Sequence, residues 1–380
     1  MKKKISIAIL IFTFLLTSCS KSEVETINIS DSRQVKTYDY QESDFIAEKV
    51  KIDDFEINTQ IDGSIRTFCI YDDTMYYTLD FLNYFENSTG VKSDTVFEEK
   101  YNTQIRSYNL ESGNDNLLYQ YEEEECIEVS DMQCNGKELV WEDYTKENTW
   151  NVKKMTINSD TLPEDIFSYD AEKGKMDSIT LTITADSLFW FDQIDNGDKP
   201  IILNKYDFKS KKITIEKKGL SLSSPYEHVN LTDGVCTTYE TNKDDTTTIH
   251  VIDFNNKDQL DISVPGSVSS PISNSEICVW VKGYDSNDRK TLFIYDITKD
   301  TLEQIEIPYA FSYGIIKDLI LVNQQDGIYC YDIKNKEYKN LIETENISYG
   351  YTFQGLNNNI YAQEHGDDHG VKIINFNINE

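Results

Sequence analysis

The sequence predicts an all-β protein built from one small antiparallel sheet that recurs along the chain, and two sets of landmarks indicate the repeat. The fragment "LFIYDITKD" at 292–300 has the same build as "ILNKYDFKSKK" at 202–212, "IHVIDFNNKD" at 249–258 and "IYCYDIKNKE" at 328–337. Each contains alternating apolar residues, an aspartate between two apolar residues, and a polar turn. Alternation of this kind is typical of a strand that leads into a tight turn.

The first set of landmarks consists of seven anchors, each a polar residue flanked by apolar residues just before a turn. They are Asn109, Thr156, Asp207, Asp253, Asp296, Asp332 and Asn375. Successive anchors are 47, 51, 46, 43, 36 and 43 residues apart. The period is therefore close to that of a four-stranded repeat.

The second set consists of an earlier apolar strand in each unit, which starts after a short polar turn. These strands start at Met75, Leu139, Leu188, Val235, Ile277, Leu319 and Ile360. They precede their anchors by 34, 17, 19, 18, 19, 13 and 15 residues, so the first unit alone carries a long insertion. Two landmarks that keep step support a true repeat.

The segments between the landmarks are short and rich in Val, Ile, Tyr, Phe, Trp and Thr, with Asn, Asp, Gly, Lys and Ser at their ends. This is strand and turn chemistry. A four-stranded unit of about 40–45 residues is typical of a β-propeller blade. Seven anchors predict seven four-stranded blades, with six or eight as alternatives.

The last unit ends at Glu380, shortly after its third strand. The segment 44–57 lies before the first unit and alternates in places. We expect it to supply the missing outer strand, because ring closure removes an open sheet edge. The predicted propeller domain is therefore 44–380.

The "YDI-x-x-K" turn after the third strand resembles the repeats of bacterial β-propellers of the TolB-like and quinoprotein-like kinds, over nearly all of residues 60–380. The resemblance implies the architecture. The consensus residues of a quinone site are absent, so it implies no cofactor. We expect the aspartate to accept backbone N–H bonds in the turn, and Tyr206, Tyr295 and Tyr331 to pack between blades.

The amino terminus reads as a targeting segment. Three lysines at 2–4 precede an uncharged apolar run at 5–16, which is too short to span about 30 Å of hydrocarbon. "LTSC" at 16–19 then resembles the lipobox of bacterial lipoproteins. The resemblance implies a signal peptide at 1–18, cleavage before Cys19, and diacylglyceryl attachment, with further acylation such as palmitate, at Cys19. A plain secretory signal with an incidental cysteine is the alternative.

The segment 19–43 is polar and lacks apolar periodicity, so we expect a lipidated, flexible tether. The expected location is the cell envelope, with the protein anchored to the membrane by lipid and facing outside the cytoplasm. One acyl chain holds a protein only marginally, whereas two or more hold it stably.

The chain has 67 acidic and 36 basic residues, which gives a formal net charge of -31. A surface of this charge repels nucleic acid and anionic lipid headgroups. We therefore expect no nucleic-acid partner, and a globular body that is held off the lipid.

Six further cysteines follow Cys19, and no CxxC pair occurs, so the spacings predict no zinc site. We expect buried thiols that pack as small apolar groups. A disulfide between Cys126 and Cys134 is the alternative for that pair.

No nucleophile, metalloprotease, phosphate-loop or dinucleotide motif is present, so we expect no catalytic residue. One segment, "EHGDDHG" at 364–370, combines imidazoles and carboxylates that suit a divalent cation. Its candidate ligands are His365, Asp367, Asp368 and His369. The alternative is an acidic hairpin loop without a metal, and we expect no other cofactor.

The first-unit insertion at 83–100 carries three candidate binding residues, Tyr84, Phe85 and Phe97. Propellers use long loops on one rim for recognition, and aromatic residues are favoured anchors. A tolerated surface insertion is the alternative.

Together these features predict a lipid-anchored envelope propeller that binds a protein, peptide or glycan without catalysis. An extracellular propeller hydrolase or lyase acting on glycan or peptide is one alternative. An envelope-assembly subunit is the other.

Overall fold

The computed structural model contains short β-strands in nearly all of the residues that it describes. These residues are 24–29, 34–57, 64–80, 103–122, 126–145, 149–159, 161–170, 179, 181–192, 201–220, 230–232, 235–242, 244–253, 258–282, 291–307, 310, 312–324, 326–343, 351–356, 359–365 and 371–378.

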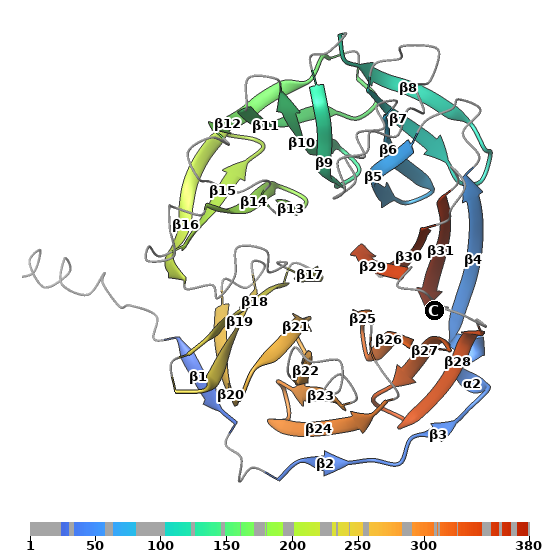
Figure 1. Ribbon diagram of the computed structural model, residues 1–380, viewed down its shortest axis with the longest axis vertical. Helices are drawn as coiled ribbons and strands as arrows, with labels where there is room; N and C mark the ends of the chain where they lie inside the picture. The colour runs from blue at the N-terminus through green and yellow to red at the C-terminus, as the bar shows by residue number, and fades with distance from the viewer. Residues whose placement is uncertain are drawn as a thin grey trace, which may run out of the picture.

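Within these ranges the strands form seven sheets that surround a central axis like the blades of a fan (Figure 1). We number the sheets blades 1 to 7 in chain order. Blade 1 contains β5 (Ser64–Tyr71), β6 (Thr74–Asp80), β7 (Gln104–Asn109) and β8 (Asp115–Gln120). Blade 2 contains β9 (Cys126–Cys134), β10 (Glu138–Thr145), β11 (Thr149–Thr156) and β12 (Glu164–Asp170). Blade 3 contains β13 (Leu181–Ile183), β14 (Ser187–Asp192), β15 (Ile201–Asp207) and β16 (Lys212–Leu220).

The other four blades repeat this arrangement. Blade 4 contains β17 (Asn230–Thr232), β18 (Val235–Thr241), β19 (Thr246–Asp253) and β20 (Asp258–Pro265). Blade 5 contains β21 (Val268–Ser273), β22 (Ile277–Lys282), β23 (Thr291–Asp296) and β24 (Thr301–Glu306). Blade 6 contains β25 (Ser312–Ile316), β26 (Leu319–Gln324), β27 (Gly327–Asp332) and β28 (Glu337–Glu343). Blade 7 contains β29 (Tyr351–Leu356), β30 (Asn359–His365) and β31 (Val371–Ile378). The prediction of an all-β, seven-bladed propeller is confirmed.

Both sets of landmarks fall where the repeat requires. Each earlier strand start lies at the first or second residue of the second strand of a blade. Six anchors are the last residues of β7, β11, β15, β19, β23 and β27, and Asn375 lies inside β31. The apolar alternation therefore marked strands that are packed on both faces within the ring.

The anchor side chains cap the turns that follow the third strands. Asp207 Oδ1 accepts from the backbone N–H of Ser210 at 2.6 Å, and Asp296 Oδ1 accepts from that of Lys299 at 2.8 Å. Asp332 Oδ1 accepts from the backbone N–H of Asn335 at 2.8 Å. The expected role of these aspartates is confirmed.

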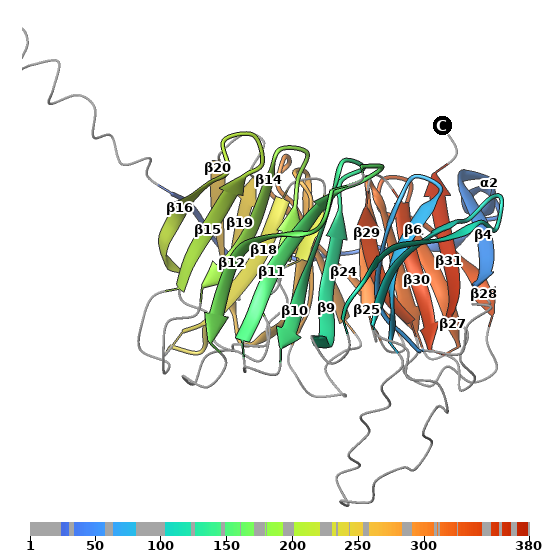
Figure 2. The same ribbon diagram turned by 90° about the horizontal axis from the view of Figure 1, so that it is seen from above.

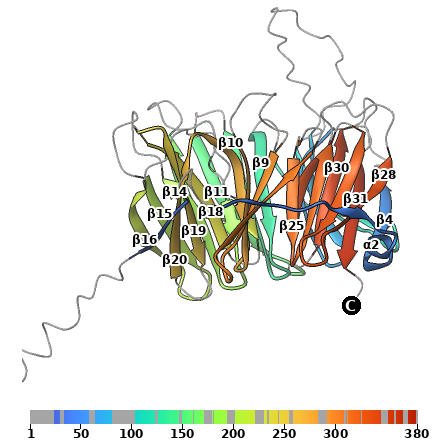
Figure 3. The same cartoon turned by 90° about the horizontal axis from the view of Figure 1, so that it is seen from below.

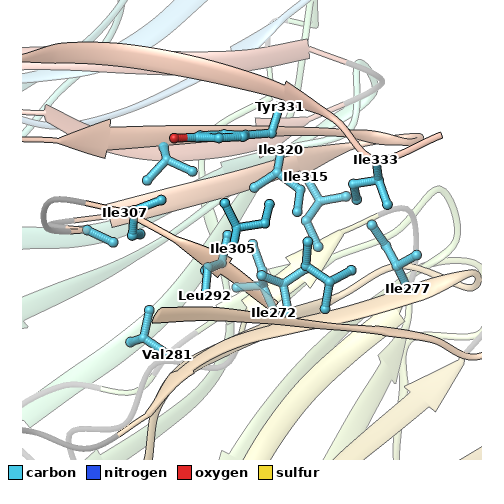
Figure 4. Close-up of a cluster of buried hydrophobic side chains, with 14 of the residues drawn as sticks. Ile272, Ile277, Val281, Leu292, Ile305, Ile307, Ile315, Ile320, Tyr331 and Ile333 are labelled. Carbon is cyan, nitrogen blue, oxygen red and sulfur yellow. The ribbon is translucent and has the colours of Figure 1, made fainter. Parts of the chain in front are cut away.

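The core lies between neighbouring blades. Figure 4 shows one buried cluster between blades 5 and 6, in which Ile272, Leu292 and Ile305 face Ile320 and Tyr331. Each fully buried side chain of this size contributes about 1.5–3 kcal/mol relative to exposure. Tyr206 and Tyr295 lie in the corresponding clusters between blades 2 and 3 and between blades 4 and 5, as expected.

The last blade receives its outer strand from the beginning of the chain. A short helix, α2 (Phe45–Lys49), leads into β4 (Val50–Ile57). β4 pairs antiparallel with β31 along its whole length, from Val50 opposite Ile378 to Ile57 opposite Val371. Ile46 of α2 is fully buried beside Phe376. This is the closure predicted for segment 44–57.

The segment before α2 follows the outside of the ring (Figure 3). β1 (Glu25–Asn28), β2 (Lys36–Thr37) and β3 (Gln41–Glu42) pair in parallel with β20, β24 and β28, the outer strands of blades 4, 5 and 6. We call residues 24–29 and 34–43 the N-terminal belt. The prediction of a flexible tether over 19–43 is wrong for the belt, since strand pairing and two buried apolar side chains, Ile29 and Tyr40, hold it.

The six cysteines after Cys19 are buried and form no disulfide, so the alternative disulfide between Cys126 and Cys134 does not form. Burial raises the pKa of the thiols of Cys236 and Cys278, which keeps them protonated and apolar. No helix within the described ranges has the length and apolar character needed to cross a membrane.

Candidate functional site

The ring has two faces that differ in the connections that reach them (Figure 2). On one, which we call the anchor face, the first strand of a blade turns into the second and the third turns into the fourth. On the other, the loop face, each second strand ends and each third strand begins. This follows from the antiparallel order of the strands in each sheet.

Most of the residues predicted to carry lipid, bind a partner or bind a metal ion lie outside the described residues. They are Cys19, Tyr84, Phe85, Phe97, Asp367, Asp368 and His369. His365 is the last residue of β30, at the loop face. β6, the strand that precedes the insertion in the sequence, also ends at the loop face, in the neighbouring blade. The roles proposed for these residues remain predictions.

The structure places a cavity on the anchor face, between blades 5 and 6, that the sequence does not predict. Its volume is about 810 Å³. Four turns form its walls, and the N-terminal belt closes its outer side with Lys36 and Tyr38. The turns contribute residues 274–277 and 296–301 from blade 5, and residues 317–318 and 333–336 from blade 6.

Among the charged residues that line this cavity, lysines outnumber acids by one. They are Lys36, Lys299, Lys317, Lys334 and Lys336, against the four acids Glu276, Asp296, Glu303 and Asp318. Five positive and four negative charges give a net charge of +1 in a chain of net charge -31. The cavity is therefore an electropositive place on an acidic surface, which attracts anions.

Two acids of the cavity are already paired. Lys299 Nζ lies 2.6 Å from Asp296 Oδ2, and Lys336 Nζ forms an ion pair with Glu303. The Lys336 ammonium also lies over the Tyr38 ring of the belt, 4.3 Å from its centroid. A cation over an aromatic face is a favourable contact, so Lys336 holds the belt against blade 6.

Lys317 and Lys334 differ from these paired lysines. Both are exposed, and neither has a carboxylate partner among the described residues. Lys317 adopts a left-handed backbone conformation, with φ of 53°, in the tight turn between β25 and β26. Together with Lys36, which is also exposed and forms no ion pair with a described residue, they are the lysines of the cavity with most freedom to bind an added anion.

Asn274 fixes the two turns that carry this part of the cavity. Its Oδ1 accepts from the backbone N–H groups of Glu276 and Ile277, both at 2.9 Å. Its Nδ2 donates to the carbonyl oxygen of Lys317 at 2.9 Å, across the boundary between blades. The position of the Lys317 backbone is therefore set by a blade 5 side chain.

The electrostatics keep the charged forms of the lining residues. Burial by itself would raise the pKa of Asp296, but bonds from Lys299 and Thr298 hold it below its usual value. Burial, aided by the carboxylates of Glu303 and Asp332, raises the pKa of the hydroxyl of the belt residue Tyr40, so that this hydroxyl stays neutral. Asp296 therefore stays a carboxylate beside Lys299.

The lining carries lysine ammonium groups and contains no histidine or cysteine. It therefore offers recognition of a carboxylate or phosphate group, by lysine ammonium groups, more readily than nucleophilic chemistry. No group of three or more potential metal ligands occurs within the described ranges.

Part of the lysine lining of this cavity could be recognised in the sequence. The "YDI-x-x-K" turn in blade 5 supplies Lys299, and the matching turn in blade 6 supplies Lys334 and Lys336. The contribution of Lys36 had no such signal, because it depends on where the belt lies.

The most strongly perturbed carboxylate lies elsewhere, between blades 2 and 3. Glu142 is fully buried and accepts from Tyr169 Oη at 2.5 Å and from the backbone N–H of Ile179 at 3.1 Å. Burial raises its pKa to about 8 despite these bonds. Because Glu142 holds the residue just before β13 and has no access to solvent, its role is structural.

Comparison with solved structures relates the ring to peptidase propellers. The β-propeller domain of the trilobed protease from Pyrococcus furiosus matches 80% of this chain and 92% of its own, with 11% identity and a TM-score of 0.52. The likeness shows the fold alone. An acylaminoacyl peptidase from Pyrococcus horikoshii matches 80% of this chain but 49% of its own, with 12% identity and a TM-score of 0.51. No protein-family model matches the sequence, and no curated protein does.

Proposed function

We propose that this chain is a lipid-anchored propeller of the cell envelope that binds a partner without catalysis. The lipobox at Leu16–Cys19 supports the anchor, and the lysine-lined cavity of the anchor face supports the binding role. The partner is a protein, peptide or glycan that presents a carboxylate, or another anionic group, to Lys317 and Lys334.

The cavity is the single observation that carries this proposal. Five lysines line this one cavity of a chain that has 67 acids and 36 bases. The net attraction is local, because charges separated by more than about 8–10 Å are screened at physiological salt. A partner therefore needs an acidic group that enters the cavity, while uncharged or distant parts of it contribute through shape.

Binding of two defined probes tests this role. A fluorescein-labelled oligoglutamate represents an acidic peptide, and a labelled oligogalacturonate represents an acidic glycan. We expect at least one probe to bind, and the double variant Lys317→Glu/Lys334→Glu to weaken that binding about tenfold or more, which corresponds to about 1.4 kcal/mol.

The matched control is Lys137→Glu/Lys282→Glu. It reverses two exposed lysines on blades 2 and 5, away from the cavity, and makes the same change in net charge. Equal loss of binding in the two double variants would show that net charge alone, and not the cavity, governs binding.

The anchor has a separate test. Cys19→Ala should release the protein from membranes in a wash without detergent, whereas the unaltered protein should need detergent. Deletion of 83–100 then asks whether the loop with Tyr84, Phe85 and Phe97 contributes to the same partner. An unchanged set of bound partners would remove that loop from the proposal.

A further inference from the structure

The outer strand of blade 3, β16, is unlike the outer strands of the following blades. Blades 4, 5 and 6 carry belt strands on their outer edges, and β4 is itself the outer strand of blade 7. Among the described residues, nothing pairs with the outer edge of β16. Residues 209–216, which include the start of this strand, are all exposed.

This edge is basic. Between residues 205 and 218 the chain has two acids and six lysines, the lysines being Lys205, Lys209, Lys211, Lys212, Lys217 and Lys218. Six positive and two negative charges give +4 over fourteen residues of a chain whose total is -31. Lys209 and Lys212 are exposed and form no ion pair with a described residue. Hydrogen bonds from Ser210, with a contribution from Lys209, lower the pKa of the nearby Asp207 carboxyl.

The same edge is apolar. Ile213 and Ile215 are 47% and 49% exposed, and Leu162, in the preceding turn of blade 2, is 79% exposed. These are three of the six large apolar side chains that are exposed among the described residues. Lys211 Nζ binds both carboxylate oxygens of Glu164 at 3.0 Å, which joins the blade 2 turn to the blade 3 edge.

We call Leu162, Lys209, Lys212, Ile213 and Ile215 the blade 3 rim. One role of lysines on an open strand edge is to prevent pairing with another chain. Exposed isoleucines beside them oppose that purpose, because an apolar edge favours association. Lysines with adjacent apolar side chains are instead typical of a surface that rests on anionic lipid.

The position of the rim adds an independent argument. β1 starts at Glu25 beside β16, and the three views of the ring agree on this placement (Figures 1–3). Cys19 is six residues before Glu25, and six extended residues reach about 20 Å. A lipid on Cys19 therefore stays within about 20 Å of Glu25, on the side of the ring where blades 3 and 4 meet, and β16 leads from there to the rim.

We propose that the blade 3 rim rests on the anionic headgroups of the membrane to which Cys19 is attached. The ring then stands edge-on, with its anchor and loop faces both open to partners. This inference rests on the proposed lipid anchor. It differs from the expectation that the whole body is held off the lipid: the acidic surface is repelled and the basic edge of β16 is attracted, so the charge distribution orients the ring.

The test measures which edge meets the lipid. The full lipidated chain is placed on phosphatidylcholine vesicles that contain about one third phosphatidylglycerol and a lipid with a nitroxide on its headgroup. A fluorescent label is attached to Thr214→Cys on β16 or, as the matched site, to Asn116→Cys on β8, the outer strand of blade 1. The six cysteines of the ring are buried, so the label reacts with the introduced thiol.

We expect the label at 214 to be quenched at least about threefold more than the label at 116. Lys209→Glu/Lys212→Glu should abolish this difference while the protein stays on the vesicles, and Lys137→Glu/Lys282→Glu should preserve it. Equal quenching at 214 and 116 in protein that remains bound would overturn the inference and leave the anchor intact. The ligand of the rim would then be an acidic protein segment instead of lipid.

Loss of the protein from the vesicles would have a different meaning. It would show that Cys19 carries no lipid, and the proposed anchor and the edge-on orientation would both fail. The two failures are therefore separate in the same experiment, since vesicle sedimentation reports the anchor and quenching reports the rim.

Discussion

At the scale of single residues, buried polar groups link the blades and give the fold a dependence on pH. Glu142 of blade 2 binds the backbone N–H of Ile179, just before the first strand of blade 3. Its pKa of about 8 means that it is largely protonated at neutral pH in the folded chain. In the unfolded chain it titrates near 4.5.

This difference predicts that stability falls as pH rises. A carboxyl whose pKa is raised on folding stabilises the native state fully below its unfolded pKa, and this contribution is lost as pH rises through the folded pKa. Glu142→Gln keeps an acceptor for Tyr169 and Ile179 but cannot ionise. Between pH 6 and pH 9 the unaltered protein should lose about 2 kcal/mol more than this variant does.

Urea unfolding at the two pH values measures the effect. Glu164→Gln provides a control, because Lys154 and Lys211 lower the pKa of this exposed carboxyl and its charge does not change in that range. An equal pH dependence in the unaltered protein and in Glu142→Gln would assign the sensitivity to another group.

At the scale of elements, the N-terminal belt is held by few contacts at each blade. The backbone N–H groups of Gln41 and Ser43 donate to the carbonyl oxygens of Lys336 and Tyr338. The Tyr40 ring packs edge-to-face on Tyr331, with centroids 5.7 Å apart. Because β2 and β3 have two residues each, Tyr40 is the main apolar attachment of this part of the belt.

We therefore expect Tyr40→Ala to release the belt locally without opening the ring. Amide hydrogen exchange at Gln41 and Ser43 should accelerate on the order of tenfold or more, while exchange in β26 and β27 stays slow. Asp39→Ala changes an exposed neighbour and should leave the belt in place. Equal acceleration across blade 6 would mean that the belt and the blade open as one unit.

The belt also shows where sequence reasoning reaches its limit. The repeat was predictable because six of the seven anchors end a strand packed on both sides, so alternation and a capped turn coincide at Asp207, Asp296 and Asp332. The belt has no such pattern, since Lys36 and Thr37 pair through backbone atoms and their side chains remain exposed. The cavity escaped prediction for the same reason, because belt residues and distant turns meet there only in three dimensions.

At the scale of the whole molecule, stability depends on closing the ring. β4 and β31 join residues from opposite ends of the domain, and Ile46 and Val50 secure this junction against Leu319 and Phe376. Lys49 adds an ion pair to the buried Asp332, with Nζ 2.5 Å from Oδ2. The junction combines strand pairing, apolar burial and one partly buried charge pair.

A charge placed in this junction should destabilise the entire domain. Ile46→Asp puts a carboxylate at a fully buried site, which we expect to cost about 4 kcal/mol or more. Phe45→Asp makes the same kind of change at a neighbouring side chain that is 52% exposed, and should cost about 1 kcal/mol or less. Thermal unfolding compares the two variants. Similar melting temperatures would show that the junction does not control the ring.

The belt and β4 also impose an order of assembly on a chain that is synthesised from its amino end. The residues that emerge first, 24–57, find their partners in blades 4 to 7, whose strands emerge last and end at Ile378. Until then the early segment has no docking place, and blade 1 has only one neighbour. Folding must therefore finish after synthesis is complete, and during that interval the unsealed chain exposes strand edges and apolar surface that favour aggregation.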